Sequence, residues 1–226
     1  MAADRLSEAL DATYACLSRY GVRRTTVDDI AREMGVSRSA VYQYVRGKDD
    51  AVRKLAMRLH DRALARAEAA AVAPVPPAER VHGILAAKLD LVLDLTGRSP
   101  HAVELLDPGA RLSGDICDAF TARLRALLTE QFTAAGRDAA VHGQVRGAVA
   151  HGQAVAGPGP VRASPGEPAA LAPTPAQCAD ICLALVVGLE TAPDAARLLR
   201  PATDALLTGL LPHRTAPLRP LQRTTS

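Results

Sequence analysis

Residues 25–50, TTVDDIAREMGVSRSAVYQYVRGKDD, contain two short helical patterns separated by a Gly-Val-Ser turn. Thr26 is placed to cap the first helix, and Gly35 can end it. Asp28 and Asp29 would then lie near the positive end of the helix dipole. The apolar residues of this helix share one face: Val27, Ile30, Ala31 and Met34. The first half of the stretch therefore predicts an amphipathic helix that ends at the turn.

The second half of the stretch predicts another short helix with a polar outer surface. Ser37 is placed as its N-cap, and Val36 can pack against Val41 as a hydrophobic staple. Val41 and Val45 would point inward. Four side chains share the outward surface: Arg38, Ser39, Tyr42 and Gln43. Two helices of about eight residues joined by a three-residue turn form a helix-turn-helix, whose second helix is sized for the major groove of DNA.

The excess positive charge of the chain lies in its N-terminal part. Residues 1–60 hold 11 Lys and Arg against 8 Asp and Glu, whereas the rest of the chain holds 16 of each. Residues 34–48 contain Arg38, Arg46 and Lys48 and no carboxylate. A polyanion would meet the least repulsion there, although charge alone is also explained by a solvated basic surface.

This stretch resembles the N-terminal signature of the tetracycline-repressor-like (TetR) family of bacterial regulators. The resemblance covers residues 6–59. The matching positions are Thr26, Ile30, Ala31, Gly35, Val36, Ser37, Tyr42, Tyr44, Lys48, Val52, Leu55 and Leu59. The chain departs from the family at Val45, where the family usually has Phe, but Val keeps the position apolar. The resemblance implies an all-α fold with an N-terminal three-helix DNA-binding domain over residues 1–47.

The resemblance also implies which residues contact DNA. The family positions that commonly contact phosphates are occupied here by Thr26, Tyr42 and Lys48, each of which can donate a hydrogen bond. Base reading would fall to the exposed face of the second helix of the motif, where three residues suit base edges: Arg38 for guanine, Gln43 for adenine, and Ser39 for either. Tyr44 has three open interpretations: a phosphate contact, contact with a thymine methyl group, or packing against the first helix.

The rest of the chain predicts a larger helical bundle over residues 48–212, joined to the DNA-binding domain by a connector helix over 48–72. Apolar residues make up 48% of the chain and aromatics only 3%, which favours helices packed by aliphatic side chains. The Gly- and Pro-rich segment 152–175 predicts a loop, either a lid or a tolerated insertion, and residues 213–226 form a polar tail. The further expected helices cover residues 78–96, 100–106, 114–135, 138–151, 175–191 and 194–211.

A small-molecule pocket and a dimer interface follow from the family resemblance. Family members often bind a small, largely apolar effector between the helices of the bundle. The candidate residues here are Leu89, Asp90, Leu93, Asp94 and His101. The alternative is that Asp90 and Asp94 are only solvated or paired with Lys88 and Arg98. The last two helices would pair with their symmetry mates, through candidates Ile181, Leu185, Gly188, Leu199 and Leu206.

Several classes of function are disfavoured by the sequence. It lacks the common motifs of hydrolases, zinc proteases and nucleotide-binding loops, so we expect no enzyme, cofactor or metal. Cys178 and Cys182 lie one helical turn apart. They could form a redox or metal pair, but the favoured interpretation is that they are small side chains packed in the core. No apolar run approaches the roughly 20 residues needed to span a bilayer, and we expect a cytoplasmic protein.

Together these features predict a homodimeric transcription regulator. The sequence favours a repressor that binds a palindromic DNA operator and is released by an unidentified small molecule. Two recognition helices about 34 Å apart could then meet successive major-groove faces. The alternative is an architectural helical protein that coats DNA without sequence preference and without an effector.

Overall fold

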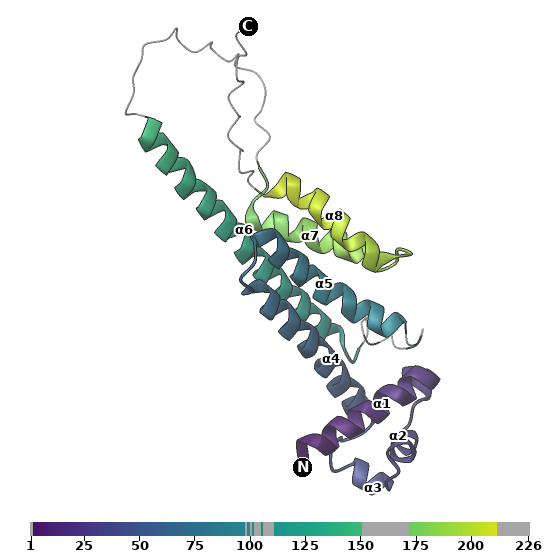
Figure 1. Cartoon of the computed structure of the whole chain (residues 1–226). Coiled ribbons are helices and arrows are strands. Elements are labelled where there is room, and N and C mark those ends of the chain that lie inside the picture. Colours follow the sequence, from purple (N-terminus) through teal and green to yellow (C-terminus); the bar gives the residue numbers. More distant parts are fainter. Residues whose placement is uncertain are drawn as a thin grey trace.

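The computed structural model describes residues 2–97, 99, 101, 105, 111–150 and 172–211, with the backbone only for residues 2, 3 and 139–150. These residues form eight helices and contain no strand, which confirms the expected all-α class. The helices are α1 Ala2–Arg24, α2 Val27–Met34, α3 Arg38–Val41, α4 Lys48–Ala71, α5 Pro77–Thr96, α6 Gly114–Ala150, α7 Pro175–Leu189 and α8 Ala195–Leu210. Helices α1–α3 lie at one end of the molecule, and α4 leads from them into the bundle of α5–α8 (Figure 1).

The N-terminal unit has a small aliphatic core of its own. Its buried side chains come from α1, α2, the segment around α3 and the start of α4: Ala12, Cys16, Val27, Ile30, Ala31, Val41, Val45 and Ala51. Val45, which replaces the usual aromatic ring, is only 2% exposed and still fills its place in this core. Aliphatic burial of this kind holds α2 and α3 at a fixed angle to each other.

The first helix is interrupted at Gly21. Gly21 has φ 77° and ψ 166°, a non-helical conformation inside α1 that side chains with a Cβ rarely adopt. Thr25 closes the short segment after it, because both its backbone N–H and its hydroxyl donate to the Gly21 carbonyl, at 3.2 and 2.8 Å. The chain is thereby turned from α1 into α2.

The connector helix α4 is anchored to α1 in its first half and to α5 further along. Arg58 donates to the Ser7 carbonyl and hydroxyl at 3.2 Å and pairs with Asp11 at 2.7 Å, which ties α4 to α1. On the other side α4 approaches α5 closely, since a Cβ placed on Gly83 would lie 2.7 Å from the Cβ of Ala70. The expected connector over residues 48–72 differs from α4 by one residue.

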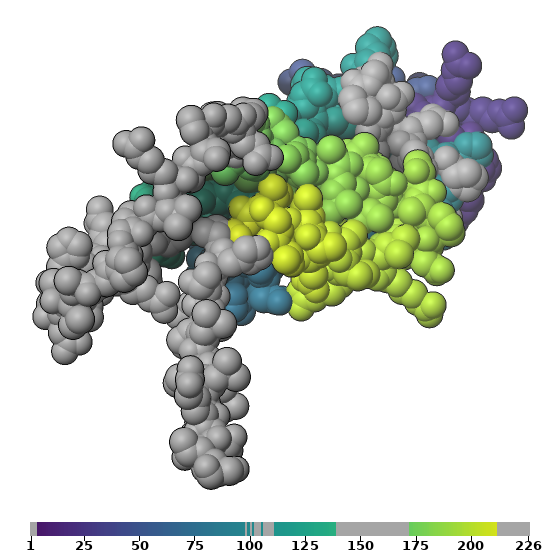
Figure 2. Space-filling model, turned by 90° about the horizontal axis from the view of Figure 1, so that it is seen from above, coloured from purple at the N-terminus to yellow at the C-terminus, as the bar shows by residue number. Residues whose placement is uncertain are grey.

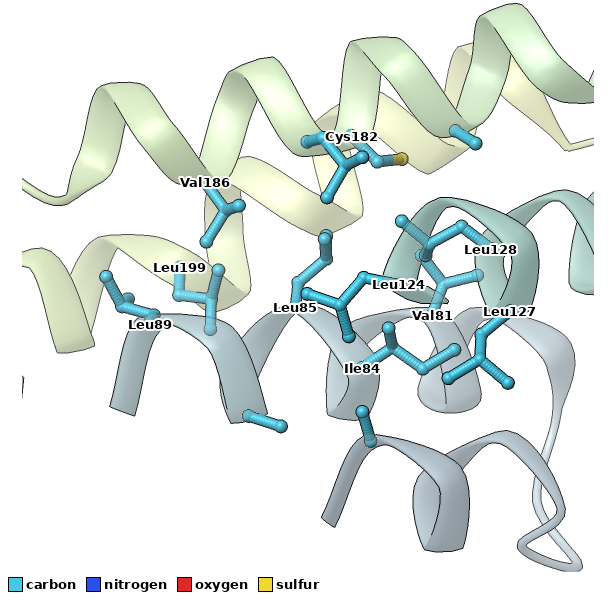
Figure 3. Close-up of a cluster of buried hydrophobic side chains, with 14 of the residues drawn as sticks. Val81, Ile84, Leu85, Leu89, Leu124, Leu127, Leu128, Cys182, Val186 and Leu199 are labelled. Carbon is cyan, nitrogen blue, oxygen red and sulfur yellow. The ribbon is translucent and has the colours of Figure 1, made fainter. Parts of the chain in front are cut away.

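Helix α5 lies at the centre of the bundle. It packs against α4, α6, α7 and α8. Figure 3 shows its side chains meeting those of α6 and α7, with Leu199 of α8 beside them. The labelled side chains are Val81, Ile84, Leu85, Leu89, Leu124, Leu127, Leu128, Cys182, Val186 and Leu199, all at most 4% exposed. This single core joins the connector to the rest of the bundle.

Five expected elements differ from the structure or lie wholly or partly outside the described residues. One continuous helix, α6, replaces the two expected at 114–135 and 138–151, because the isolated Gly136 does not end a helix that is otherwise built of good helix formers. The expected helix at 100–106 is described only at residues 101 and 105, and most of 152–175 and all of 213–226 lie outside the described residues. No described helix is long and apolar enough to cross a membrane.

Candidate nucleic-acid interface

The turn between α2 and α3 is fixed by hydrogen bonds at both of its ends. Gly35 has φ 66° and ψ 30°, and its N–H donates to the Arg32 carbonyl, while the Val36 N–H reaches the Ala31 carbonyl at 3.0 Å. This left-handed glycine ends α2 in the manner typical of a Schellman motif. Ser37 then accepts a hydrogen bond from the Ala40 N–H at 3.3 Å and caps α3 as expected.

Helix α3 is shorter than the eight residues expected. It covers Arg38–Val41, after which Gln43 donates to the Ala40 carbonyl and Tyr44 to the Val41 carbonyl, both three residues back. The chain therefore continues beyond Val41 as a tighter turn of 3₁₀ type. Because this turn keeps the backbone coiled, Tyr42 and Gln43 remain on the same outer surface as the residues of α3.

The structure brings the expected base-reading residues together on one exposed surface. Arg38, Ser39, Tyr42 and Gln43 are exposed, whereas Val41 and Val45 are 0% and 2% exposed. The apolar side of the segment is thus inserted into the small N-terminal core, and its polar side is free to meet a ligand. We call these four exposed residues the recognition surface.

Arg38 does not extend freely from this surface, because two neighbours hold it. Its Nε and Nη2 donate to the Tyr42 hydroxyl oxygen at 3.2 and 2.9 Å, and its Nη1 donates to the Asp28 carboxylate on α2 at 3.3 Å. The guanidinium carbon lies 5.5 Å from the centre of the Tyr42 ring. The hydrogen bond with Tyr42 and the negative charge of Asp28 raise the pKa of Arg38. Sequence reasoning missed the role of Asp28.

Thr26, expected at a phosphate, is engaged in capping α2. Its hydroxyl accepts from the Asp29 N–H at 3.2 Å and donates to the Asp29 carboxylate at 2.6 Å, and its own N–H donates to the same carboxylate at 3.0 Å. This is a reciprocal capping box, and hydrogen bonds from the Thr26 side chain and backbone lower the pKa of Asp29. A phosphate would have to compete with Asp29 for the Thr26 hydroxyl.

Lys48 lies beside further basic residues, of which the charge pattern of the sequence singled out Arg46 but not Arg23 or Arg24. Its Nζ donates to the Arg23 carbonyl at 3.3 Å, so the start of α4 lies next to the end of α1. Arg23, Arg24 and Arg46 are exposed there. Adjacent arginines just before the cap of α2 are the signal that could have identified them. The arrangement places Lys48 beside the end of α1, where exposed arginines add positive charge that would attract a polyanion.

The shape of the surface at Lys48 is concave. Residues 46–50 line a shallow hollow of about 380 Å³ at the start of α4. Asp50 organises this segment, since it accepts from the Arg46 N–H at 2.8 Å and pairs with Lys54 at 2.9 Å. Tyr44 is half-buried, and its carbonyl accepts from Lys54 at 2.9 Å. These contacts leave the three interpretations of the Tyr44 side chain open.

The candidate effector residues differ in how deeply they are buried. Leu89 is fully buried in the bundle core and Leu93 is half-buried, whereas Asp90, Asp94 and His101 are exposed. Lys88 pairs with Glu190, the residue that follows α7, at 2.5 Å. The acidic side chains of α5 thus lie in solvent, and the leucines alone face the interior.

The candidate dimer residues divide between the surface and the core. Ile181 and Gly188 of α7 are exposed, and Leu185 and Leu206 are half-buried. Leu199, in contrast, is 4% exposed and packs within the core of its own chain. Its neighbour Leu198 is 42% exposed and takes the outward position instead. Figure 2 shows α7 in green and α8 in yellow forming one continuous face of the molecule.

The two cysteines of α7 belong to the core. Cys178 and Cys182 are at most 3% exposed, free, and packed against side chains of the bundle. Burial raises the pKa of the Cys182 thiol to about 12. A thiol held in its protonated form is a poor nucleophile and a poor metal ligand, which favours the packing interpretation.

Comparison with known proteins shows that the segment with this surface is similar to a family of bacterial regulators. Residues 9–55, which include α2, the turn and α3, match the bacterial regulatory proteins of the tetR family. No curated protein matches the chain. The matched residues contain the whole recognition surface together with Thr26, Asp28 and Lys48.

Solved structures of regulators share the fold over almost the whole chain. A transcriptional regulator of the TetR/AcrR family from Thermobifida fusca YX-ER1 superposes with a TM-score of 0.62 at 19% identity, over 91% of this chain and 98% of that one. FadR from Bacillus subtilis, solved with stearoyl-CoA, superposes with a TM-score of 0.57 at 13% identity, over 90% of this chain and 98% of that one. AibR, solved with isovaleryl coenzyme A and operator DNA, superposes with a TM-score of 0.55 at 16% identity, over 89% of this chain and 97% of that one.

Proposed function

Because the N-terminal domain of this chain belongs to the tetR family of DNA-binding transcription regulators, we propose that the protein is a homodimeric repressor that binds a palindromic operator. The observation that carries the proposal is the recognition surface. Arg38, Ser39 and Gln43 are exposed side by side on a rigidly capped turn of helix, while the opposite side of that helix is buried. Such an arrangement suits insertion into a major groove.

Base contacts and phosphate contacts come from different parts of this surface in our proposal. Arg38 reads guanine, Gln43 reads adenine, and Ser39 contacts a base edge of either kind. Lys48 and the Tyr42 hydroxyl donate to phosphates, with Tyr44 and Thr26 as further phosphate contacts once Thr26 leaves Asp29. The exposed arginines at the end of α1 add sequence-independent attraction.

Dimerisation through α7 and α8 supplies the second recognition surface. Three large apolar side chains are exposed on these helices, Ile181 at 39%, Val187 at 52% and Leu198 at 42%. A Cβ added at Gly188 would meet nothing within 4 Å, so a second chain can approach the helix closely there. Leu185 and Leu206 on the same two helices are half-buried, and Leu199 is buried in the core of the bundle. Apolar surface of this kind is buried when subunits pair.

Release by a small, largely apolar effector is the second part of the proposal. FadR and AibR, which share this fold, were solved with acyl-coenzyme A ligands, which supports a bundle able to take such a molecule. Leu89 and Leu93 are the residues of this chain that we expect nearest the apolar part. Asp90, Asp94 and His101 lie in solvent and could contact only a polar group at the opening.

Selection of bound duplexes from a random pool tests the proposal. We expect recovery of one near-palindromic site whose half-sites are about one helical turn apart, bound about 10³-fold more tightly than random duplexes. Light scattering should give the mass of two chains, and Ile181→Asp should give one chain with much weaker operator binding. A monomer with equal affinity for every duplex would favour the architectural alternative and contradict the repressor.

The effector requires a separate measurement. Stearoyl-CoA and isovaleryl-CoA serve as probes in titrations of the selected duplex complex. We expect at least one acyl chain to raise the melting temperature of the protein and to lower its operator affinity, because a ligand that binds the free form better shifts the population toward it. If neither probe changes either quantity, an acyl-CoA effector is excluded and the proposal reduces to operator binding.

A further inference from the structure

Asp28 places a negative charge directly on a surface that otherwise suits a polyanion. It lies in the first turn of α2, and its side chain, like that of Arg38, is 58% exposed. A carboxylate at this place repels phosphates and weakens binding to every duplex. The contact that it does make is with Nη1 of Arg38, at 3.3 Å across the turn between the two helices.

Tyr42 and Asp28 hold the guanidinium of Arg38 from two sides. The Tyr42 hydroxyl oxygen accepts hydrogen bonds from Nε and Nη2, and the Asp28 carboxylate accepts one from Nη1. A guanidinium has five N–H donors, so these three bonds leave one N–H on each terminal nitrogen. Two N–H groups on neighbouring nitrogens are what a bidentate contact with O6 and N7 of guanine requires.

The Tyr42 hydroxyl can serve the backbone of DNA at the same time. Its oxygen accepts from Arg38, which leaves its own proton to donate to a phosphate oxygen. Arg38 and Tyr42 thus form one unit in which the phenol is fixed by the arginine and the arginine by the phenol and Asp28. Asp28 is the only member of this unit with no hydrogen to offer a phosphate.

We propose that Asp28 is a positioning residue that holds Arg38 in the orientation that reads guanine, at the expense of general affinity for DNA. This inference rests on the proposed sequence-specific binding. A long arginine side chain loses rotamer freedom when it is immobilised on a base, and a side chain already held loses less. We expect this holding to improve discrimination for guanine by about 3- to 10-fold. Asp28 thereby acts on specificity through Arg38 and without touching the base.

The test compares Asp28→Asn with a matched charge change at Asp49. Asp49 is also exposed, also lies in the first turn of a helix, and also pairs with an arginine, Arg111, at 2.7 Å. Each variant is titrated with the selected duplex and with the same duplex carrying adenine in place of the guanine that Arg38 reads. Circular dichroism checks that the helical content is unchanged.

Asp28→Asn should bind the adenine duplex more tightly than wild type and should lose about 3- to 10-fold in discrimination between the two duplexes. Asp49→Asn should bind both duplexes more tightly by the same factor. In an Arg38→Ala background, Asp28→Asn should leave discrimination unchanged, because there is no arginine left to hold. Tyr42→Phe should lower discrimination as Asp28→Asn does.

The outcomes separate this inference from the proposed function. If wild type prefers the selected duplex and Asp28→Asn keeps the full preference, Asp28 has no positioning role and the inference is overturned. The same conclusion follows if Asp28→Asn and Asp49→Asn change both duplexes alike. If wild type itself binds all duplexes equally, the proposed sequence-specific function fails first, whatever the variants do.

Discussion

Arg53 of α4 and Asp115 of α6 form a two-point ion pair. Arg53 Nη1 donates to one carboxylate oxygen at 2.7 Å and Nη2 donates to the other at 2.5 Å. Nη1 also reaches the Leu112 carbonyl at 3.2 Å, and Arg111 pairs with Asp49 one turn earlier on α4. The beginning of the connector helix is therefore fastened to the beginning of α6 at several points.

This pair should contribute little to global stability in spite of its geometry. The side chains are 43% and 63% exposed, and exposed ion pairs contribute about 0–1 kcal/mol. Arg53→Met should lower the free energy of unfolding in urea by less than about 1 kcal/mol. A double-mutant cycle with Asp115→Asn isolates the pair, and a coupling above about 3 kcal/mol would contradict the solvent-exposed arrangement.

Lys48 and Arg38 should differ in how their removal affects DNA binding. Lys48→Ala should weaken binding to all duplexes and reduce the slope of log K against log salt by about one. Arg38→Ala should cost about 1–3 kcal/mol and relax preference at one base pair. Titrations at several salt concentrations, with the selected and a random duplex, measure both quantities. Equal effects of the two substitutions on both duplexes would refute the assigned roles.

The capping box of α2 gives a prediction that combines stability with acid pH. Thr26→Ala should lower the free energy of unfolding by about 0.5–2 kcal/mol, and Thr26→Ser should retain most of it. Asp29 has a folded-state pKa below its ordinary 3.8, chiefly because of the Thr26 hydroxyl. The contribution of ionised Asp29 to the free energy of unfolding is thus complete above pH 3.8 and is lost as the pH falls through the folded pKa. In urea unfolding between pH 5 and 2, the free energy of unfolding of Thr26→Ala should fall less steeply with decreasing pH than that of wild type. The same pH dependence in both proteins would contradict this prediction.

The close approach of α4 and α5 makes Gly83 intolerant of a methyl group. A Cβ there would lie 2.7 Å from the Cβ of Ala70, so Gly83→Ala should destabilise the bundle by about 1–3 kcal/mol in spite of better helix propensity. Gly136 of α6 is the control, since nothing lies within 4 Å of an added Cβ and Gly136→Ala should stabilise by up to about 1 kcal/mol. Ala70→Gly combined with Gly83→Ala should relieve the overlap. A stabilised Gly83→Ala would show that the helices separate freely.

His60 predicts a loss of stability below neutral pH. It is 4% exposed, its Nδ1 donates to the Ala56 carbonyl at 2.8 Å, and Nε2 lies 3.6 Å from Sγ of Cys117. Burial lowers the pKa of His60 from the ordinary 6.5. Below pH 6.5 this histidine is therefore protonated in the unfolded chain while it is still largely neutral in the folded chain, which favours unfolding. The free energy of unfolding should therefore decline as the pH falls from 7 toward 5.

The His60 contribution can be separated from that of other histidines. His60→Gln should flatten this decline, although it should also lower stability at pH 7 because the site is buried. His82 serves as the comparison. Burial also lowers the pKa of His82, but its side chain is only half-buried, whereas that of His60 is buried. An identical pH slope in wild type and His60→Gln would show that His60 is not the titrating group.

Local signals predicted the motif well, whereas relationships between helices did not follow from the sequence. Thr26, Gly35 and Ser37 act on the backbone within a few residues, and all three cap or end helices as expected. The contact of Arg38 with Asp28 depends on the angle between α2 and α3, which neither helical pattern contains. The end of α3 at Val41 is likewise not contained in the apolar pattern, which continues to Val45.

Apolar repeats gave the helices of the bundle but left the outward face of α8 ambiguous. Leu198 and Leu199 are adjacent and equally apolar, so composition could not tell which faces the core, and the structure puts Leu199 inside. Gly136 lies between the two helices expected at 114–135 and 138–151, yet one glycine costs only about 1 kcal/mol and α6 continues through it. Faces and breaks are decided by tertiary packing rather than by local preference.

Leu10 and Leu17 of α1 pack in a cluster with Val52 and Leu55 of α4 and with Leu105, which precedes α6. Transplanting residues 1–47 onto another bundle would strip both leucines of these neighbours and expose them to water. A chimaera intended to carry the DNA preference of this protein should instead be joined beyond Leu59, with a leucine supplied by the recipient in place of Leu105.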